Sequence, residues 1–333
     1  MAATNSWIRI GTPGLAWRAA GLFAVGLALG MPGTDAAAAW KPTREIKIIV
    51  PAGPGGGSDQ FVRQIAKAAE KVNPKVKIVV ENISGGGGAT GFTAYMGLDA
   101  DGYTFVSVYP EVGLKIADGT LPFKATQVQP VMRAQAGPAT LLGKAGETRF
   151  KNYDEMIAFM KKSGKELVVA TYTLRGFDDL TLAAIEKKEG VKFKRVPYVK
   201  AGERFAALMG GHVDLLTQRI GDVMKFIDAK KMTPIIVDLP KRLEKFPDLP
   251  TFKDKNIALT LRYWRGIWAN AKTPKEAVAF MDDLLHKAMS EKGYESYEKS
   301  RYYDLVDGYL DHKAFADYVK KEIDIYGAAY GKK

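Results

Sequence analysis

The sequence predicts an α/β fold with two lobes and a ligand cleft between them. Short apolar stretches typical of buried strands alternate with amphipathic stretches of helical spacing, as in parallel βαβ units. The alternation occurs in two groups, one before and one after about residue 137, and a long strand and two helices follow the second group. The chain has 333 residues, which suits two domains rather than one.

The first group contains three strands and two helices. The stretch EIKIIV ends at Val50, and the residues that follow place Phe61, Val62, Ile65 and Ala69 on one face of a helix. VKIVVEN and YTFVSV are typical of strands on either side of a short helix. We therefore expect strands at 45–50, 76–82 and 103–108 and helices after residue 58 and near 91–98.

The second group repeats this scheme. Asn152 and Glu155 form a capping pair for a helix that stops at Gly164, and Asp178 opens a helix that ends at Gly190. A further helix is expected at about 202–210. The expected strands are at 167–171, 192–198, 213–217 and 234–238.

The remaining elements suggest how the two lobes are divided. LTLRYWRGIWA (259–269) reads as a long strand, Thr273 to Glu276 as a capping box with proline at the first helical position, and Asp311 as the cap of a last helix. We expect residues 40–137 and 267–333 to form lobe 1 and residues 138–266 to form lobe 2. Ligands of such folds bind beyond the carboxyl ends of the strands.

Residues 1–39 have the pattern of a secretory signal peptide. Arg9 and Arg18 precede an apolar run at 19–31, and small residues follow up to Ala39. The alternative is a membrane anchor, but this run is too short to cross a hydrocarbon core of about 30 Å as a helix. The chain has no cysteine, so it has neither disulfides nor the attachment residue of a bacterial lipid anchor. We expect cleavage near Ala39 and release into the periplasm.

The charge of the chain is basic but dispersed. The net charge is +12, of which the two arginines and one aspartate of residues 1–39 account for +1. The lysines form no long run and do not alternate with aromatic residues, which argues against a nucleic-acid partner. A solvated basic surface explains the charge, and steering of anionic ligands is the alternative.

Catalysis, metals and cofactors find little support in the residues. His212, His286 and His312 lie far apart, and none has a second ligand at metal-binding spacing. No G-x-S-x-G elbow is present, and paired acids such as Asp178-Asp179 are explained by capping. We expect no enzyme activity, no catalytic residue, no metal and no cofactor.

The glycine-rich loop that follows Val50 predicts an anion site. It reads PAGPGGG, lies at the carboxyl end of a strand and leads into a helix. Glycine lets the backbone approach a ligand closely, and the first amides of a helix are unpaired at the positive end of its dipole. Such an arrangement binds carboxylates and phosphates. We expect Ser58 at the N-cap of this helix and Asp59 in its first turn.

A second glycine loop, SGGGGATG (84–91), follows the second expected strand. Two such loops on neighbouring parallel strands can close on one small anion, and the alternative is that both are only tight turns. Gly86, Gly88 and Gly91 also fit G-x-G-x-x-G, a weak dinucleotide pattern. The following acids, Asp99 and Asp101, come too early for that use.

Several stretches, taken in order, resemble one family. They are P-x-x-P-G-G-G-S-D at 51–59, V-E-N with glycines at 80–88, D-G-Y-T at 101–104, V-P-Y at 196–198, G-G-H-V-D-L at 210–215, F-P-D-L-P-T at 246–251 and W-x-G-I-W-A-x-A-x-T-P at 264–274. Over almost all of residues 41–333 the chain resembles the periplasmic substrate-binding receptors of tripartite tricarboxylate transporters, the Bug family. The resemblance implies a periplasmic-binding-protein-like fold of type II, a monomer, and small and large membrane subunits as partners.

The resemblance also implies which residues bind the ligand. In the family the first two loops hold one carboxyl group through backbone amides and water, and the loop after the third strand, here 109–111, faces the cleft. Carried over to this sequence, these positions are Pro51, Gly53, Gly55, Gly56, Ser58, Asp59, Gly86, Gly87 and Tyr109.

Lobe 2 departs from the family pattern. A loop rich in glycine and serine, with a histidine, is usual where this chain has TYTLRGFDD (171–179), and Asp-Asn is usual where it has Gln218-Arg219. Arg175 and Arg219 can clamp a second carboxylate, or they can pair with the nearby acids Asp178, Asp179 or Asp222. In this lobe and the connecting strand we expect the cleft to be lined by Tyr172, Thr173, Arg175, Gly176, Arg219 and Trp264.

The sequence therefore predicts a periplasmic solute receptor. It is expected to bind a small organic acid (a di- or tricarboxylate or an aromatic acid) by lobe closure and to deliver it to a tripartite tricarboxylate-type transporter. The alternative is an exported sensor that uses the same cleft to signal to a membrane kinase.

Overall fold

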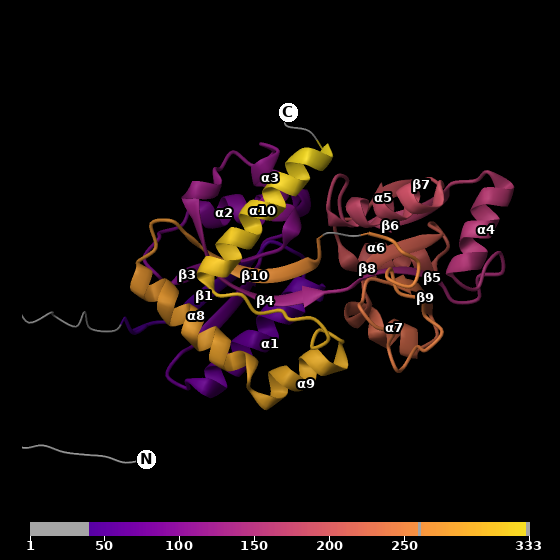
Figure 1. Ribbon diagram of the computed structural model, residues 1–333. Helices are drawn as coiled ribbons and strands as arrows, with labels where there is room; N and C mark the ends of the chain where they lie inside the picture. Colours follow the sequence, from indigo (N-terminus) through magenta and orange to yellow (C-terminus); the bar gives the residue numbers. More distant parts are fainter. Residues whose placement is uncertain (1–39, 259–260, 331–333) are drawn as a thin grey trace, which may run out of the picture. The chain divides into compact units, whose positions relative to one another are not determined.

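A computed structural model describes residues 40–258 and 261–330 (Figure 1). The expected signal peptide, residues 1–39, lies outside the described residues. Within the described ranges, no helix has the length and apolar character that crossing a bilayer requires. The polypeptide forms two five-stranded sheets, each with helices on both faces, so the α/β class that the alternating pattern predicts is confirmed.

The first sheet is mostly built from the beginning of the chain. Its strand order is β2-β1-β3-β10-β4, with β1 parallel to β2 and β3, and β10 antiparallel to β3 and β4. The strands are β1 (Ile46–Val50), β2 (Ile78–Asn82), β3 (Thr104–Val108), β4 (Val128–Gly137) and β10 (Tyr263–Asn270). Its helices are α1 (Gly57–Val72), α2 (Ala89–Met96), α3 (Pro110–Ala117), α8 (Lys275–Met289), α9 (Lys292–Ser300) and α10 (His312–Tyr330).

The second sheet is built from the middle of the chain. Its strand order is β7-β6-β8-β5-β9, and β5 lies antiparallel between β8 and β9. The strands are β5 (Ala139–Lys144), β6 (Leu167–Thr171), β7 (Phe193–Pro197), β8 (Leu215–Arg219) and β9 (Met232–Val237). Its helices are α4 (Tyr153–Ser163), α5 (Phe177–Glu189), α6 (Ala201–Met209) and α7 (Met224–Asp228).

Each sheet is buried on both faces, which explains the continuous apolar strands in the sequence. In β1, Ile46, Ile48 and Val50 pack into the core shared with α1 and α8, and Ile49 packs into the opposite core with α2, α3 and α10. This follows from the alternation of side chains across a strand. The second sheet likewise separates a core under α4 and α5 from a core under α6 and α7.

The chain passes from the first sheet to the second at Pro138. β4 ends at Gly137 and β5 begins at Ala139, because proline has no amide hydrogen to continue a strand ladder. The sequence patterns did not reveal these two strands. β10 returns the chain to the first sheet and begins at Tyr263, later than expected, so residues 263–266 pair with β4. The lobe boundaries at 137/138 and 266/267 stay a prediction.

Candidate functional site

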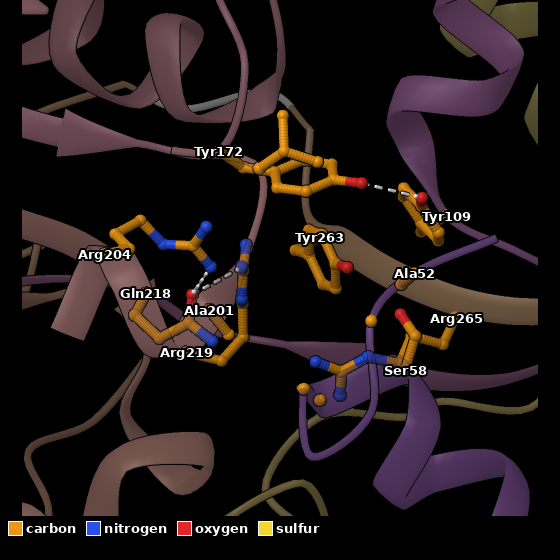
Figure 2. Close-up of a pocket in the computed structure, with 14 residues that line it drawn as sticks. Ala52, Ser58, Tyr109, Tyr172, Ala201, Arg204, Gln218, Arg219, Tyr263 and Arg265 are labelled. Atoms are coloured by element: carbon orange, nitrogen blue, oxygen red, sulfur yellow. Dashed lines mark hydrogen bonds between the residues drawn. The ribbon is translucent and has the colours of Figure 1, made fainter. Parts of the chain in front are cut away.

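A small pocket lies between the two sheets, at the carboxyl ends of β1, β3 and β8 (Figure 2). Its volume is about 50 Å³, counted as space open to the centre of a water molecule. The first glycine loop and the start of α1 line one side, and residues of α6, β8 and β10 line the other. Six of the residues predicted from the sequence meet here: Gly53, Gly56, Ser58, Tyr109, Tyr172 and Arg219.

The amino terminus of α1 faces this pocket. The N-cap is Gly56, not Ser58 as we expected, and it makes no side-chain capping hydrogen bond. Ser58 is the second helical residue, and its buried side chain lines the pocket. Within the described part of the chain the amides of Gly57 and Ser58 have no hydrogen-bond acceptor. These amides and the helix dipole favour an anion in the pocket.

Asp59 shapes the loop and does not line the pocket. Its Oδ2 accepts a hydrogen bond from the amide of Gly55 at 2.8 Å, and its Oδ1 accepts one from Arg63 Nε at 2.8 Å. Gly55 has a φ of +73°, a left-handed conformation that favours glycine. Gly55 and Asp59 therefore hold the turn that directs the α1 amides towards the pocket.

Three buried arginines surround the pocket. Arg265 Nη2 lies 2.7 Å from Asp222 Oδ2, and Arg219 Nη1 lies 3.7 Å from Asp178 Oδ1. Arg204 has no acid within 4 Å among the described residues, although burial lowers the pKa of its guanidinium. An arginine stays charged even in such surroundings, so Arg204 leaves one positive charge at the pocket without an ion-pair partner.

Gln218 holds two of these arginines side by side. Its Oε1 accepts hydrogen bonds from Arg204 Nη2 at 3.2 Å and from Arg219 Nη2 at 3.0 Å (Figure 2). Its Nε2 donates to Asp222 at 3.0 Å. The guanidinium of Arg219 also lies over the ring of Tyr263, 3.7 Å from the ring centroid. The arginines are therefore fixed before any ligand arrives, which lowers the entropic cost of binding.

The sequence left open whether Arg219 faces the ligand or pairs with a nearby acid, and the structure describes both contacts. Arg219 pairs with Asp178 and also lines the pocket, so the two alternatives are not exclusive for this residue. Arg175 does not line the pocket, and its amide donates to Asp179. The structure therefore does not bring the two arginines together as a clamp at the pocket.

The second glycine loop does not line this pocket. A Cβ on Gly87 would lie 2.6 Å from Thr173 Cγ2 and 3.1 Å from Lys115 Cε, and a Cβ on Gly88 would lie 2.5 Å from the hydroxyl of Tyr109. Side chains from both sheets thus occupy the space beside the loop. The glycines allow this close packing, and the expected anion-binding role of Gly86 and Gly87 stays a prediction.

Four more of the predicted residues lie near the pocket without lining it. The carbonyl of Pro51 accepts a hydrogen bond from the Tyr109 hydroxyl at 2.7 Å. Thr173 packs against the second glycine loop, and Gly176 lies against Glu111. The indole of Trp264 is fully buried and donates to Glu322. Neighbouring residues of a strand face opposite ways, so Tyr263 and Arg265 face the pocket where we expected Trp264.

Sequence reasoning missed several of the lining residues, chiefly Gly57, Arg204, Gln218, Tyr263 and Arg265. One signal for Arg204 was present, because it shares the buried face of α6 with Phe205 and Leu208 at helical spacing. No comparable pattern marks Arg265. In residues 40–258 and 261–330 no group of three or more histidine or acidic side chains could hold a metal ion.

Comparison with known proteins identifies the family. The model of the tripartite tricarboxylate transporter family receptor matches residues 61–325. The protein BugT of Bordetella pertussis is 24% identical over 257 residues, which cover 75% of this chain and 78% of BugT.

Solved structures share the fold. The periplasmic binding protein BugD has a TM-score of 0.75 at 21% identity and covers 87% of this chain and 97% of its own. MatC from Rhodopseudomonas palustris, solved with bound malate, has a TM-score of 0.75 at 21% identity and covers 86% of this chain and 99% of its own. The two-sheet architecture, the pocket between the sheets and the family match agree: the chain belongs to the tripartite tricarboxylate transporter receptor family.

Proposed function

We propose that this receptor binds a small organic carboxylate in the pocket between its two sheets and delivers it to a tripartite tricarboxylate-type membrane transporter. The observation that carries the proposal is the unpaired charge of Arg204 opposite the uncapped amides of α1. Both groups attract an anion, and the planar guanidinium matches a carboxylate. The malate in MatC supports the same ligand class.

The two sides of the pocket belong to different sheets, so a ligand that bridges them favours the closed arrangement. The α1 amides come from the first sheet, and Arg204 and Arg219 come from the second. A ligand shifts an open–closed equilibrium by the difference between its affinities for the two states. Binding without covalent chemistry is therefore the proposed activity, with a monomer as the binding unit.

Export and partners complete the proposal. Residues 1–39 would direct the chain to the periplasm and be removed near Ala39, and the small and large membrane subunits of the transporter would receive the ligand. Both follow from the family to which the chain belongs and from the pattern of the first 39 residues.

The test is a titration of the purified protein with mono-, di- and tricarboxylates by thermal shift and calorimetry. At least one acid should raise the melting temperature of the wild-type protein. Arg204→Gln should weaken its binding by roughly 10- to 100-fold, as expected for loss of about 1.5–3 kcal/mol from a charged hydrogen bond. A protein that responds to no carboxylate would contradict the proposal.

Arg242→Gln is the matched control. Arg242 also belongs to the middle of the chain, but it is half exposed and pairs with Asp254 away from the pocket. The substitution Arg242→Gln removes one positive charge from the protein, as Arg204→Gln does. Equal losses of affinity in both variants would mean that only net charge matters, and not the position of Arg204.

A further inference from the structure

The loops before α1 and α5 have the same geometry, although their sequences differ. Each helix follows a strand that is parallel to both of its neighbours, and each begins after a glycine N-cap, Gly56 or Gly176. The residue before each cap is left-handed, with a φ of +73° at Gly55 and +56° at Arg175. We call the space in front of the first amides of such a helix its entrance. The structure thus contains two equivalent helix entrances, one beside each sheet.

The equivalence extends to the acid that holds each turn. Asp59 is the third residue of α1, and its carboxylate accepts the amide hydrogen of Gly55. Asp179 is the third residue of α5, and its carboxylate accepts the amide hydrogen of Arg175. Both carboxylates turn back to hydrogen-bond a backbone amide of their own loop, so neither blocks the space in front of the first helical amides.

The two entrances differ in what lies in front of them. The α1 entrance opens into the pocket. At the α5 entrance lies the side chain of Glu111, which comes from α3 of the other sheet. A Cβ on Gly176 would lie 3.3 Å from Glu111 Cγ and 3.5 Å from Glu111 Oε1, so the Glu111 carboxyl group lies beside the N-cap of α5.

Glu111 is enclosed at this position. Its side chain is 2% exposed, and its Oε2 has no hydrogen-bond partner among the described residues. The pKa of Glu111 is raised to about 7, chiefly by burial and then by the charge of Asp178, against the opposing effect of Arg219. A carboxyl group held in this way occupies the space that a ligand's carboxylate would need to reach the α5 amides.

We propose that Glu111 supplies the protein's own carboxyl group at the α5 entrance and thereby restricts the ligand to a single carboxylate at the α1 entrance. This inference rests on the proposed function and narrows the ligand from organic acids in general to small monocarboxylates. It replaces the di- or tricarboxylate that the family resemblance suggests.

The charges at the pocket fit a single carboxylate. Of the three arginines that line it, Arg219 and Arg265 each have an aspartate within 4 Å, and Arg204 has none among the described residues. One carboxylate balances one unpaired charge, whereas a second would be buried without a cation of its own. The small volume of about 50 Å³ also suits a short acid.

The experiment compares acids of equal chain length that differ by one carboxyl group. Calorimetry is performed with butyrate against succinate and with 3-hydroxybutyrate against malate. The wild-type protein should bind the better monocarboxylate at least tenfold more tightly than its dicarboxylate counterpart. Glu111→Ala vacates the α5 entrance, so its relative affinity for the dicarboxylate should rise at least tenfold.

Glu111→Gln is the matched control, because its amide fills the same space. It should keep the preference for monocarboxylates, whereas a preference lost equally in both variants would overturn the blocking role of the side chain. If Glu111→Ala does not fold, the comparison of acids on the wild-type protein still decides whether the ligand is a monocarboxylate.

The possible failures are distinguishable. A wild-type protein that binds succinate as tightly as butyrate, or malate as tightly as 3-hydroxybutyrate, overturns this inference and leaves the proposed function standing. Binding of no carboxylate by any of the three proteins overturns both.

Discussion

The hydroxyl of Tyr172 donates a hydrogen bond to the hydroxyl of Tyr109 over 2.9 Å, from the end of β6 in one sheet to the end of β3 in the other. The direction follows because the single hydroxyl hydrogen of Tyr109 is donated to the carbonyl of Pro51. The rings also meet edge to face, with centroids 5.9 Å apart. Through Tyr109 and the carbonyl of Pro51, this hydrogen bond links the second sheet to the first glycine loop beside the pocket.

Removing the hydrogen bond between Tyr172 and Tyr109 should destabilise the contact between the two sheets at the pocket. We expect Tyr172→Phe to lower the free energy of unfolding by about 1 kcal/mol, the usual value of one hydrogen bond, and to weaken carboxylate binding several-fold. Urea denaturation and calorimetry measure the two effects. Tyr198→Phe is the control, because the hydrogen bonds of Tyr198 among the described residues are made by its backbone, with Arg204 and Thr171, and not by its hydroxyl. Additive losses in a double variant with Tyr109→Phe would show that the two tyrosines are not coupled.

Gly57 should tolerate no side chain. A Cβ there would lie 2.0 Å from Arg265 Nη2 and 2.2 Å from Asp222 Oδ2, so Gly57→Ala must displace this ion pair or the α1 amides. We expect a loss of carboxylate affinity of at least tenfold, measured by calorimetry. Gly202→Ala in the first turn of α6 is the matched control, because Gly202 is exposed, does not line the pocket, and its Cβ would meet nothing within 4 Å. Similar affinities for the two variants would mean that the Gly57 contact does not shape the pocket.

The ion pair of Arg265 and Asp222 connects β10 to the turn after β8. Tyr303 completes it, because its hydroxyl donates to Asp222 Oδ1 at 2.9 Å and accepts from Arg265 Nη1 at 2.6 Å. Burial opposes ionisation, but Arg265 and Arg219 keep the pKa of Asp222 below its usual range.

Asp222→Asn would leave a buried arginine without its counterion. We expect the free energy of unfolding to fall by about 3–5 kcal/mol, measured by urea denaturation. The double variant Asp222→Leu/Arg265→Met removes both charges and should be more stable than Asp222→Asn alone. A single variant that is as stable as the wild-type protein would show that solvent reaches Arg265.

Stability should fall as the pH rises, because buried glutamates ionise less readily in the folded protein. Burial raises the pKa of Glu322 from 4.5 to about 8, against the hydrogen bonds from Trp264. Between these values the folded state binds more protons than the unfolded state, so unfolding becomes easier with each step upwards in pH. One such group contributes at most about 1.4 kcal/mol per pH unit.

Glu322→Gln keeps an acceptor for the Trp264 indole and removes this titration. The loss of stability between pH 5 and pH 8, measured by urea midpoints, should therefore be smaller in the variant. It should not vanish, because burial also raises the pKa of Glu111 and of Glu298 to about 7. An unchanged pH dependence would show that Glu322 is ionised in the folded protein.

The sequence by itself determined the features that depend on neighbouring residues. Alternating apolar periods predicted the α/β fold, and the glycine run after Val50 predicted that a helix begins just beyond the end of β1. The family followed from stretches in the correct order. These properties are local, because hydrogen bonding within a helix and alternation along a strand involve residues only a few positions apart.

Only the tertiary structure decided which side chains meet at the pocket. Arg204, Tyr263 and Arg265 come from separate elements, and no periodicity relates one element to another in space. The second glycine loop had the same appearance in the sequence as the first, yet Thr173 and Lys115 fill the space beside it. Glu111 was expected only to belong to a loop facing the cleft, and packing between the two sheets placed it at the entrance of α5.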